Sequence, residues 1–141
     1  MQYWLLKTEP NTWSWEDQLK VEMEGWDGVR NYQASNNMKK MKIGDLCFFY
    51  HSVKEKTIKG IVRVVKEYYP DHTDDTDRWG MVGVSAVCSV KTEVSLADIK
   101  AKAELQQMAL VRQSRLSVSP VSKEEWQIIT QMCNLSVKDF T

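Results

Sequence analysis

Apolar residues gather in the middle of the chain, in runs that are typical of strands. The run LCFFYHS at 46–52 is the strongest, IKGIVRVVKEYY at 58–69 is a long partner, and WGMVGVSAVCSV at 79–90 is a third. The short segment VKEKT between the first two predicts a hairpin. Shorter apolar segments at 2–7 and 116–121 predict two further strands near the ends of the chain.

Four segments carry the signals of helices. Three of them begin with the spacing of a capping box, in which two side chains satisfy free backbone N–H groups at a helix start; the pairs are Ser14–Asp17, Ser95–Asp98 and Ser122–Glu125. We expect these helices to run from the first cap to about Glu24, over 96–110 and over 123–132. The fourth, at about 32–41, places Ala34, Met38 and Met41 on one apolar face.

The central strand decides the fold class. Its residues are bulky on both sides, with Leu46, Phe48 and Tyr50 on one face and Cys47, Phe49 and His51 on the other. Only a sheet that is covered on both faces buries both sets. Because the strands do not alternate strictly with helices, we predict an α+β fold. We expect a single domain over 1–141: a curled, mixed and mainly antiparallel sheet, or pseudo-barrel, with helices packed outside.

Composition narrows the possible partners and locations. Lys plus Arg equals Asp plus Glu at 19 each, whereas proteins that hold nucleic acid by charge alone are clearly basic. Any phosphate contacts must therefore be few and local. Three widely spaced cysteines form no disulfide framework, and neither a membrane span nor a secretory signal is expected. We expect a cytoplasmic bacterial protein, or a nuclear one in a eukaryote.

Catalytic and metal chemistry finds little support in the residues. His51 and Ser52 are neighbours, and neighbours on a strand point to opposite faces, so they cannot form a Ser–His pair. There are two histidines, His51 and His72, no C-x-x-C motif and no glycine-rich phosphate loop. We therefore expect no catalytic residue, no metal and no cofactor.

The tryptophans are more informative than the charges. Four of the six are expected in the core or at its edge, whereas Trp26 and Trp79 lie beside glycines and polar residues at the ends of elements. Each could be a loop anchor that plugs the fold or a wall on which a flat ligand stacks. The side chain of Asn31 can read the edge of a base, and Arg30 can meet a phosphate.

Several blocks of the sequence resemble the EVE domain family. They are YWLLKTEP at 3–10, WDGVRNYQA at 26–34, MKIGD at 41–45, FFYHS at 48–52 and LVRQSRLSVSPV at 110–121. The resemblance implies a PUA-like fold that is similar to the YTH domains, which hold a methylated adenine in an aromatic cage. It also implies binding of modified bases, such as methylcytosine and its oxidised forms, in DNA or RNA, without catalysis.

The resemblance assigns roles to individual positions. Lys7 and Trp26 match a lysine and the first cage tryptophan of YTH domains, and Trp79 matches the second more loosely. Further blocks expected near the pocket supply Tyr50, His51 and Ser52 and, later in the chain, Arg115 and Ser117. Ser35 stands where the family pattern has an arginine, which weakens the expected grip on phosphate.

Three hypotheses follow from these observations. The first is a non-catalytic reader of a modified base, which stacks on Trp26 while Lys7, Arg30 and Arg115 meet phosphate in a single-stranded or flipped-out site. The second is an enzyme acting on nucleic acid or a nucleotide through Asp27 or His51. The third is a protein-interaction module, which requires Trp26 on a convex patch.

Overall fold

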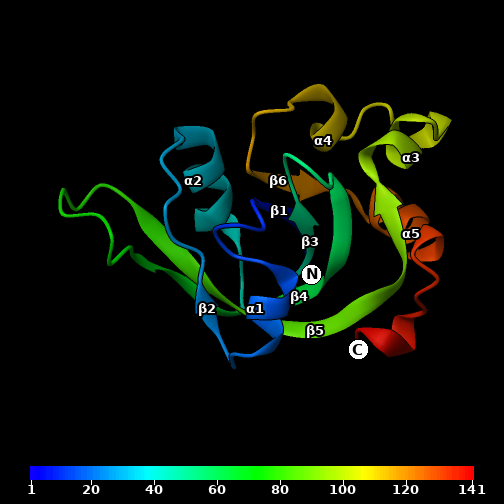
Figure 1. Ribbon diagram of the computed structural model, residues 1–141. Helices are drawn as coiled ribbons and strands as arrows, with labels where there is room; N and C mark the ends of the chain where they lie inside the picture. Colours follow the sequence, from blue (N-terminus) through cyan, green and yellow to red (C-terminus); the bar gives the residue numbers. More distant parts are fainter.

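Six strands form one curled sheet with helices on both of its faces (Figure 1). The computed structural model describes all residues from 1 to 141. The strands run in the order β2-β5-β4-β3-β1-β6, in which β1 and β3 are parallel and all other neighbours are antiparallel. Their bounds are β1 Tyr3–Thr8, β2 Glu24–Gly25, β3 Leu46–His51, β4 Thr57–Pro70, β5 Gly80–Ser95 and β6 Val118–Val121. The predicted mixed, mainly antiparallel α+β sheet is confirmed, and it stays open.

Five α-helices surround the sheet, and none of them is long and apolar enough to cross a membrane. Their bounds are α1 Trp15–Leu19, α2 Tyr32–Lys40, α3 Leu96–Lys100, α4 Ala109–Arg112 and α5 Lys123–Met132, with short 3-10 turns at Ala103–Leu105 and Val137–Asp139. All three predicted capping boxes are present, at the starts of α1, α3 and α5.

The two faces of β3 are buried in two separate cores. Leu46, Phe48 and Tyr50 pack against a cluster that contains Trp126 of α5. Cys47 and Phe49 belong to a second cluster, which includes Trp15, Trp26 and the α2 residues Ala34 and Met38. The alternation predicted from the sequence is therefore confirmed, because helices cover both faces of the strand.

The predicted helix from Ser14 to about Glu24 is wrong in its second half. It ends at Leu19, and Glu24 and Gly25 instead pair with β5 at the edge of the sheet. Gly25 suits this close packing, because a Cβ atom there would lie 2.8 Å from the Met81 sulfur and from the Tyr69 hydroxyl. The extended course of these residues determines where the side chain of Trp26 points.

The predicted helix at 96–110 is also broken. The chain forms α3, a 3-10 turn and α4 in its place, and β5 continues to Ser95, five residues further than predicted for 79–90. The short elements bury Ile99, Leu105 and Leu110 in the core on the α5 side of the sheet.

Candidate nucleic-acid interface

A pocket of about 310 Å³ opens beside Trp26, where the loops after β1 and β2 meet. Three segments supply its walls: the end of β1 with the turn that follows it, the 24–30 segment, and one residue near β6. The lining residues are Lys7, Thr8, Glu9, Thr12, Trp13, Glu24, Gly25, Trp26, Asp27, Gly28, Val29, Arg30 and Ser117. Aromatic faces, carboxylates and cations therefore share one hollow.

Trp26 belongs both to the core and to the pocket wall. Its backbone N–H donates to the Val82 carbonyl at 2.8 Å, which extends the pairing of β2 with β5 by one residue. The indole packs edge-on against Phe49, with 5.5 Å between ring centroids, and the residue is 6% exposed. The ring is thus held rigidly, and its remaining accessible surface faces the pocket.

Trp13 is the second aromatic residue of this pocket, whereas the sequence predicts it in the core or at its edge. Its indole N–H donates to the Gln18 side-chain oxygen at 2.9 Å. Gln18 is fully buried and donates in turn to the Val84 carbonyl, so the ring is fixed from α1 and β5. The place of Trp13 directly before the Ser14 cap was the available signal, since a side chain there lies outside the helix.

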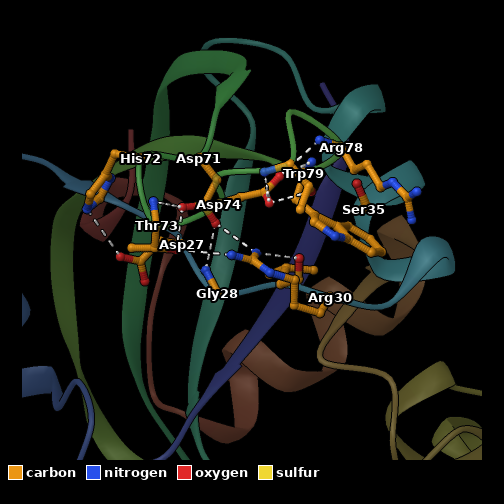
Figure 2. A network of polar contacts seen from close by, with 12 residues as sticks. Asp27, Gly28, Arg30, Ser35, Asp71, His72, Thr73, Asp74, Arg78 and Trp79 are labelled. Carbon is orange, nitrogen blue, oxygen red and sulfur yellow. Dashed lines mark hydrogen bonds and ion pairs between the residues drawn. The ribbon is translucent and has the colours of Figure 1, made fainter.

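Asp71, at the end of β4, fastens the loop that carries Trp26 (Figure 2). Its buried carboxylate accepts hydrogen bonds from the Gly28 backbone N–H at 2.8 Å and from Arg30 at 3.0 Å. Thr73 donates to the other carboxylate oxygen through both its N–H and its hydroxyl. Burial alone would raise the pKa of Asp71, but these hydrogen bonds outweigh it and lower the pKa to about 2.

The expectation that Arg30 is free to meet a phosphate is corrected by these contacts. One guanidinium nitrogen bonds to Asp71 and to the Val29 carbonyl, and another donates to the Thr73 hydroxyl at 3.1 Å. The Asp71 carboxylate neutralises its charge at close range. Arg30 lines the pocket, but its donors hold two loops together.

Trp79 lies outside the pocket, contrary to the expectation of a second cage wall. Its ring packs on Tyr32 with 4.9 Å between centroids, and the Arg30 guanidinium lies 5.9 Å from it. Figure 2 shows the indole beside the Arg30 side chain. The Trp79 backbone N–H donates to the Asp74 carboxylate at 2.8 Å, and the ring lies beside Tyr32 of α2, where it lines a different hollow.

His51 is also absent from the pocket, because it is buried and fully bonded. Its Nε2 accepts the Trp15 backbone N–H at 3.0 Å, and its Nδ1 therefore carries the proton and lies 2.9 Å from a Glu55 oxygen. The imidazole is 2% exposed. It connects β3 to the start of α1 and has no access to a ligand.

Tyr50, Ser52 and Arg115 line an adjoining pocket of about 580 Å³. The two pockets share Lys7, Thr8, Glu9 and Ser117, so they adjoin each other. The Lys7 ammonium donates to the Ser114 carbonyl at 2.7 Å, and burial lowers its pKa. Arg115 and Lys56 are exposed on the rim of this second pocket.

Asn31 caps α2 instead of lining the Trp26 pocket. Its side-chain oxygen accepts the Ala34 backbone N–H at 2.9 Å, as an N-cap residue does. The residue borders a third, shallower hollow together with Arg115 and Gln113. The predicted reading of a base edge by Asn31 is thus not supported at the pocket that Trp26 lines.

Comparison with known proteins connects this geometry to a family. The EVE domain profile matches residues 2–132. Human thymocyte nuclear protein 1 is 36% identical, over 92% of this chain and 73% of its own length. A crystal structure from Agrobacterium tumefaciens superposes with a TM-score of 0.95 at 48% identity, covering 97% of this chain and 96% of that one.

Two further structures extend the comparison. Human THYN1, crystallised in complex with 5-methylcytosine containing DNA, superposes with a TM-score of 0.88 at 34% identity, covering 96% of this chain and 99% of that one. The Mmi1 YTH domain shares the fold, with a TM-score of 0.60 at 11% identity. The resemblance seen in the sequence is confirmed, and the chain belongs to the EVE domain family.

Proposed function

We propose that this protein is a non-catalytic module that binds a modified nucleobase in DNA or RNA, held in the pocket between Trp13 and Trp26. One observation carries the proposal: an aromatic-walled pocket lies in a chain that matches, over nearly its whole length, a human protein crystallised with 5-methylcytosine containing DNA. A pocket of about 310 Å³ is in the size range of small-ligand sites.

The aromatic walls supply most of the affinity for a base. Stacking of a base on an aromatic side chain contributes about 1–3 kcal/mol. A methyl group that becomes buried against the rings of Trp13 or Trp26 adds about 0.8 kcal/mol. An apolar slot that separates ligands differing by one methyl group reaches about 10- to 200-fold discrimination at most. The preference for a modified base over the plain base is expected within this range.

The target base is proposed to be unpaired or already flipped out. Extruding a base from a duplex costs a few kcal/mol, and this chain has no net positive charge with which to offset that cost. Arg115 is proposed to meet the flanking phosphates from the rim of the adjoining pocket, whereas the Lys7 ammonium, which was predicted to share this role, already donates to the Ser114 carbonyl. Tyr50, Ser52 and Ser117 are proposed to contact the same stretch of strand. We propose that the protein acts where such a partner is found, in the bacterial cytoplasm or in a eukaryotic nucleus.

Binding without turnover is supported by the state of the reactive side chains. His51 is occupied by Trp15 and Glu55, and Asp27 lies in an exposed turn 3.7 Å from His72. Burial raises the pKa of the Cys47 thiol, and it raises that of Cys133 to about 12, so neither is an activated nucleophile. Neither the buried His51 imidazole nor these two thiols is thus placed to act on a bound base.

A base panel tests the proposal. Single-stranded oligonucleotides that differ only at one central position, carrying cytosine, 5-methylcytosine, 5-hydroxymethylcytosine, adenine or N6-methyladenine, are titrated by fluorescence anisotropy. We expect at least one modified base to bind several-fold more tightly than its plain parent. Equal affinity for every member of the panel would overturn the proposal.

A further inference from the structure

We infer that the Glu24 carboxylate reads the exocyclic amino group of the bound base, so that the pocket separates 5-methylcytosine from thymine. The inference rests on the proposed function and adds to it the chemistry of the base edge. Thymine and 5-methylcytosine carry the same methyl group and differ at position 4, where a carbonyl oxygen replaces an amino group, and at N3, which carries a hydrogen only in thymine. The apolar walls cannot tell the two apart, so a polar group must.

The charges around the pocket favour an edge that donates hydrogen bonds. Glu9, Glu24 and Asp27 line it with carboxylates. Its two cations are engaged elsewhere, since Lys7 donates to the Ser114 carbonyl and Arg30 is paired with Asp71. An anionic phosphate is therefore disfavoured in this pocket, and a neutral heterocycle with N–H donors is favoured.

Glu24 is the carboxylate best placed to contact a base that stacks on Trp26. The two residues are separated by Gly25 in an extended segment, in which alternate side chains point to the same side. Both side chains line the pocket. Glu24 is half-buried, whereas Glu9 and Asp27 are exposed.

The Glu24 carboxylate has no hydrogen-bond donor within the protein. Burial is the largest cause that raises its pKa, and the negative charge of Asp27 raises it further. No hydrogen bond contributes to the shift. This differs from Asp71, whose carboxylate is satisfied by Gly28, Arg30 and Thr73. An ionised carboxylate only accepts hydrogen bonds, so a ligand amino group would satisfy it.

A carboxylate at the edge of the base predicts which bases bind more tightly and which bind more weakly. Asp and Glu side chains accept from the cytosine N4 amino group, and a well-formed pair of this kind discriminates by about 1–3 kcal/mol. The thymine O4 oxygen would face the carboxylate without a proton between them. A base that carries its own carboxylate, such as 5-carboxylcytosine, would be repelled in the same way.

A matched set of ligands and variants tests the inference. Oligonucleotides with central 5-methylcytosine, thymine, cytosine or 5-carboxylcytosine are titrated into wild type, Glu24→Gln and Glu22→Gln. Glu22 is a suitable control because it is exposed, lies two residues away and does not line the pocket. Wild type and Glu22→Gln should favour 5-methylcytosine over thymine by about tenfold or more, and Glu24→Gln should reduce that ratio to about twofold. Circular dichroism confirms that each variant is folded.

The outcomes separate this inference from the proposed function. If wild type prefers 5-methylcytosine to cytosine but binds thymine equally well, the modified-base pocket stands and the role of Glu24 is refuted. That role is refuted as well if the preference over thymine survives in Glu24→Gln. If neither 5-methylcytosine nor 5-carboxylcytosine is distinguished from cytosine, the panel counts against the proposed function itself for this class of base.

Discussion

The backbone N–H of Gly28 donates to the buried carboxylate of Asp71 at 2.8 Å, across 43 residues of sequence. Gly28 has a φ of +76°, in the left-handed region that favours glycine, so the N–H can turn toward β4. This bond, together with the ion pair from Arg30 to the same oxygen, fixes the segment that begins at Trp26. The pocket wall is therefore positioned by a carboxylate that does not itself line the pocket.

Replacing Asp71 by Asn should destabilise the protein in a pH-dependent manner. A pKa of about 2 in the folded state, against about 3.9 when unfolded, corresponds to about 2–3 kcal/mol of stability. Because the folded-state pKa is lowered, this contribution is complete above about pH 4 and is lost as the pH falls toward 2. Urea unfolding of both proteins between pH 7 and pH 2 should show the difference in free energy shrink over that window. A difference that is constant with pH would contradict the assignment.

His51→Ala should reduce stability and leave base preference unchanged. The substitution leaves the buried Trp15 N–H without its acceptor, which costs about 1–3 kcal/mol before any cavity is counted. His72→Ala is the matched control, because the His72 side chain is 68% exposed and its loss should change stability by less than about 0.5 kcal/mol. Thermal unfolding gives the stabilities, and the base panel gives the preference. Loss of base preference in a folded His51→Ala protein would place the imidazole in the site after all.

Trp13→Leu should weaken binding of the preferred oligonucleotide by about 5- to 150-fold, the equivalent of one stacking contact. Leucine retains an apolar side chain beside Gln18 but offers no flat face to a base. Tyr32→Leu provides the control, since Tyr32 is a 67% exposed aromatic residue that packs on Trp79 outside the pocket. Anisotropy titrations measure both variants. A similar loss in the two would indicate a diffuse aromatic surface instead of a defined pocket.

The dependence of affinity on salt should be shallow and should identify the cations that meet phosphate. Each phosphate contact on a single strand contributes about −0.7 to the slope of log K against log salt concentration. Arg115→Ala should make the slope less steep by about that amount. Arg30→Ala should change it less, because Asp71 already neutralises this guanidinium. An equal change of slope in both variants would show that Arg30 contacts a phosphate as Arg115 does.

The elements that could be predicted from the sequence were those determined by local patterns. The alternation along 46–51 identified β3 and its two covered faces, and the three Ser-x-x-acid pairs located the starts of α1, α3 and α5. Each of these signals lies within a few residues of the element it specifies. The order of the family blocks then added the PUA-like arrangement, which no single segment contains.

The parts of the site that could not be predicted depend on contacts between distant residues. Glu24 and Gly25 join β5 through residues 83 and 84, so a segment with helical spacing becomes a strand. Asp71 lies in an acidic stretch that gives no sign of its bonds to Gly28 and Arg30. The sequence therefore predicted Trp13 in the core or at its edge and, through the family resemblance, Trp79 in the pocket, whereas Trp13 lines the pocket and Trp79 lies outside it.

The most direct test of the central claim is a titration of 5-methylcytosine and cytosine oligonucleotides into wild type, Trp26→Leu and Trp79→Leu. Leucine at 26 retains apolar packing against Phe49 and removes the stacking face, and circular dichroism verifies that each variant is folded. We expect Trp26→Leu to lose about 1–3 kcal/mol of binding free energy together with the preference for the methylated base, while Trp79→Leu keeps both. A folded Trp26→Leu protein that still prefers 5-methylcytosine would contradict the role of Trp26 in the pocket.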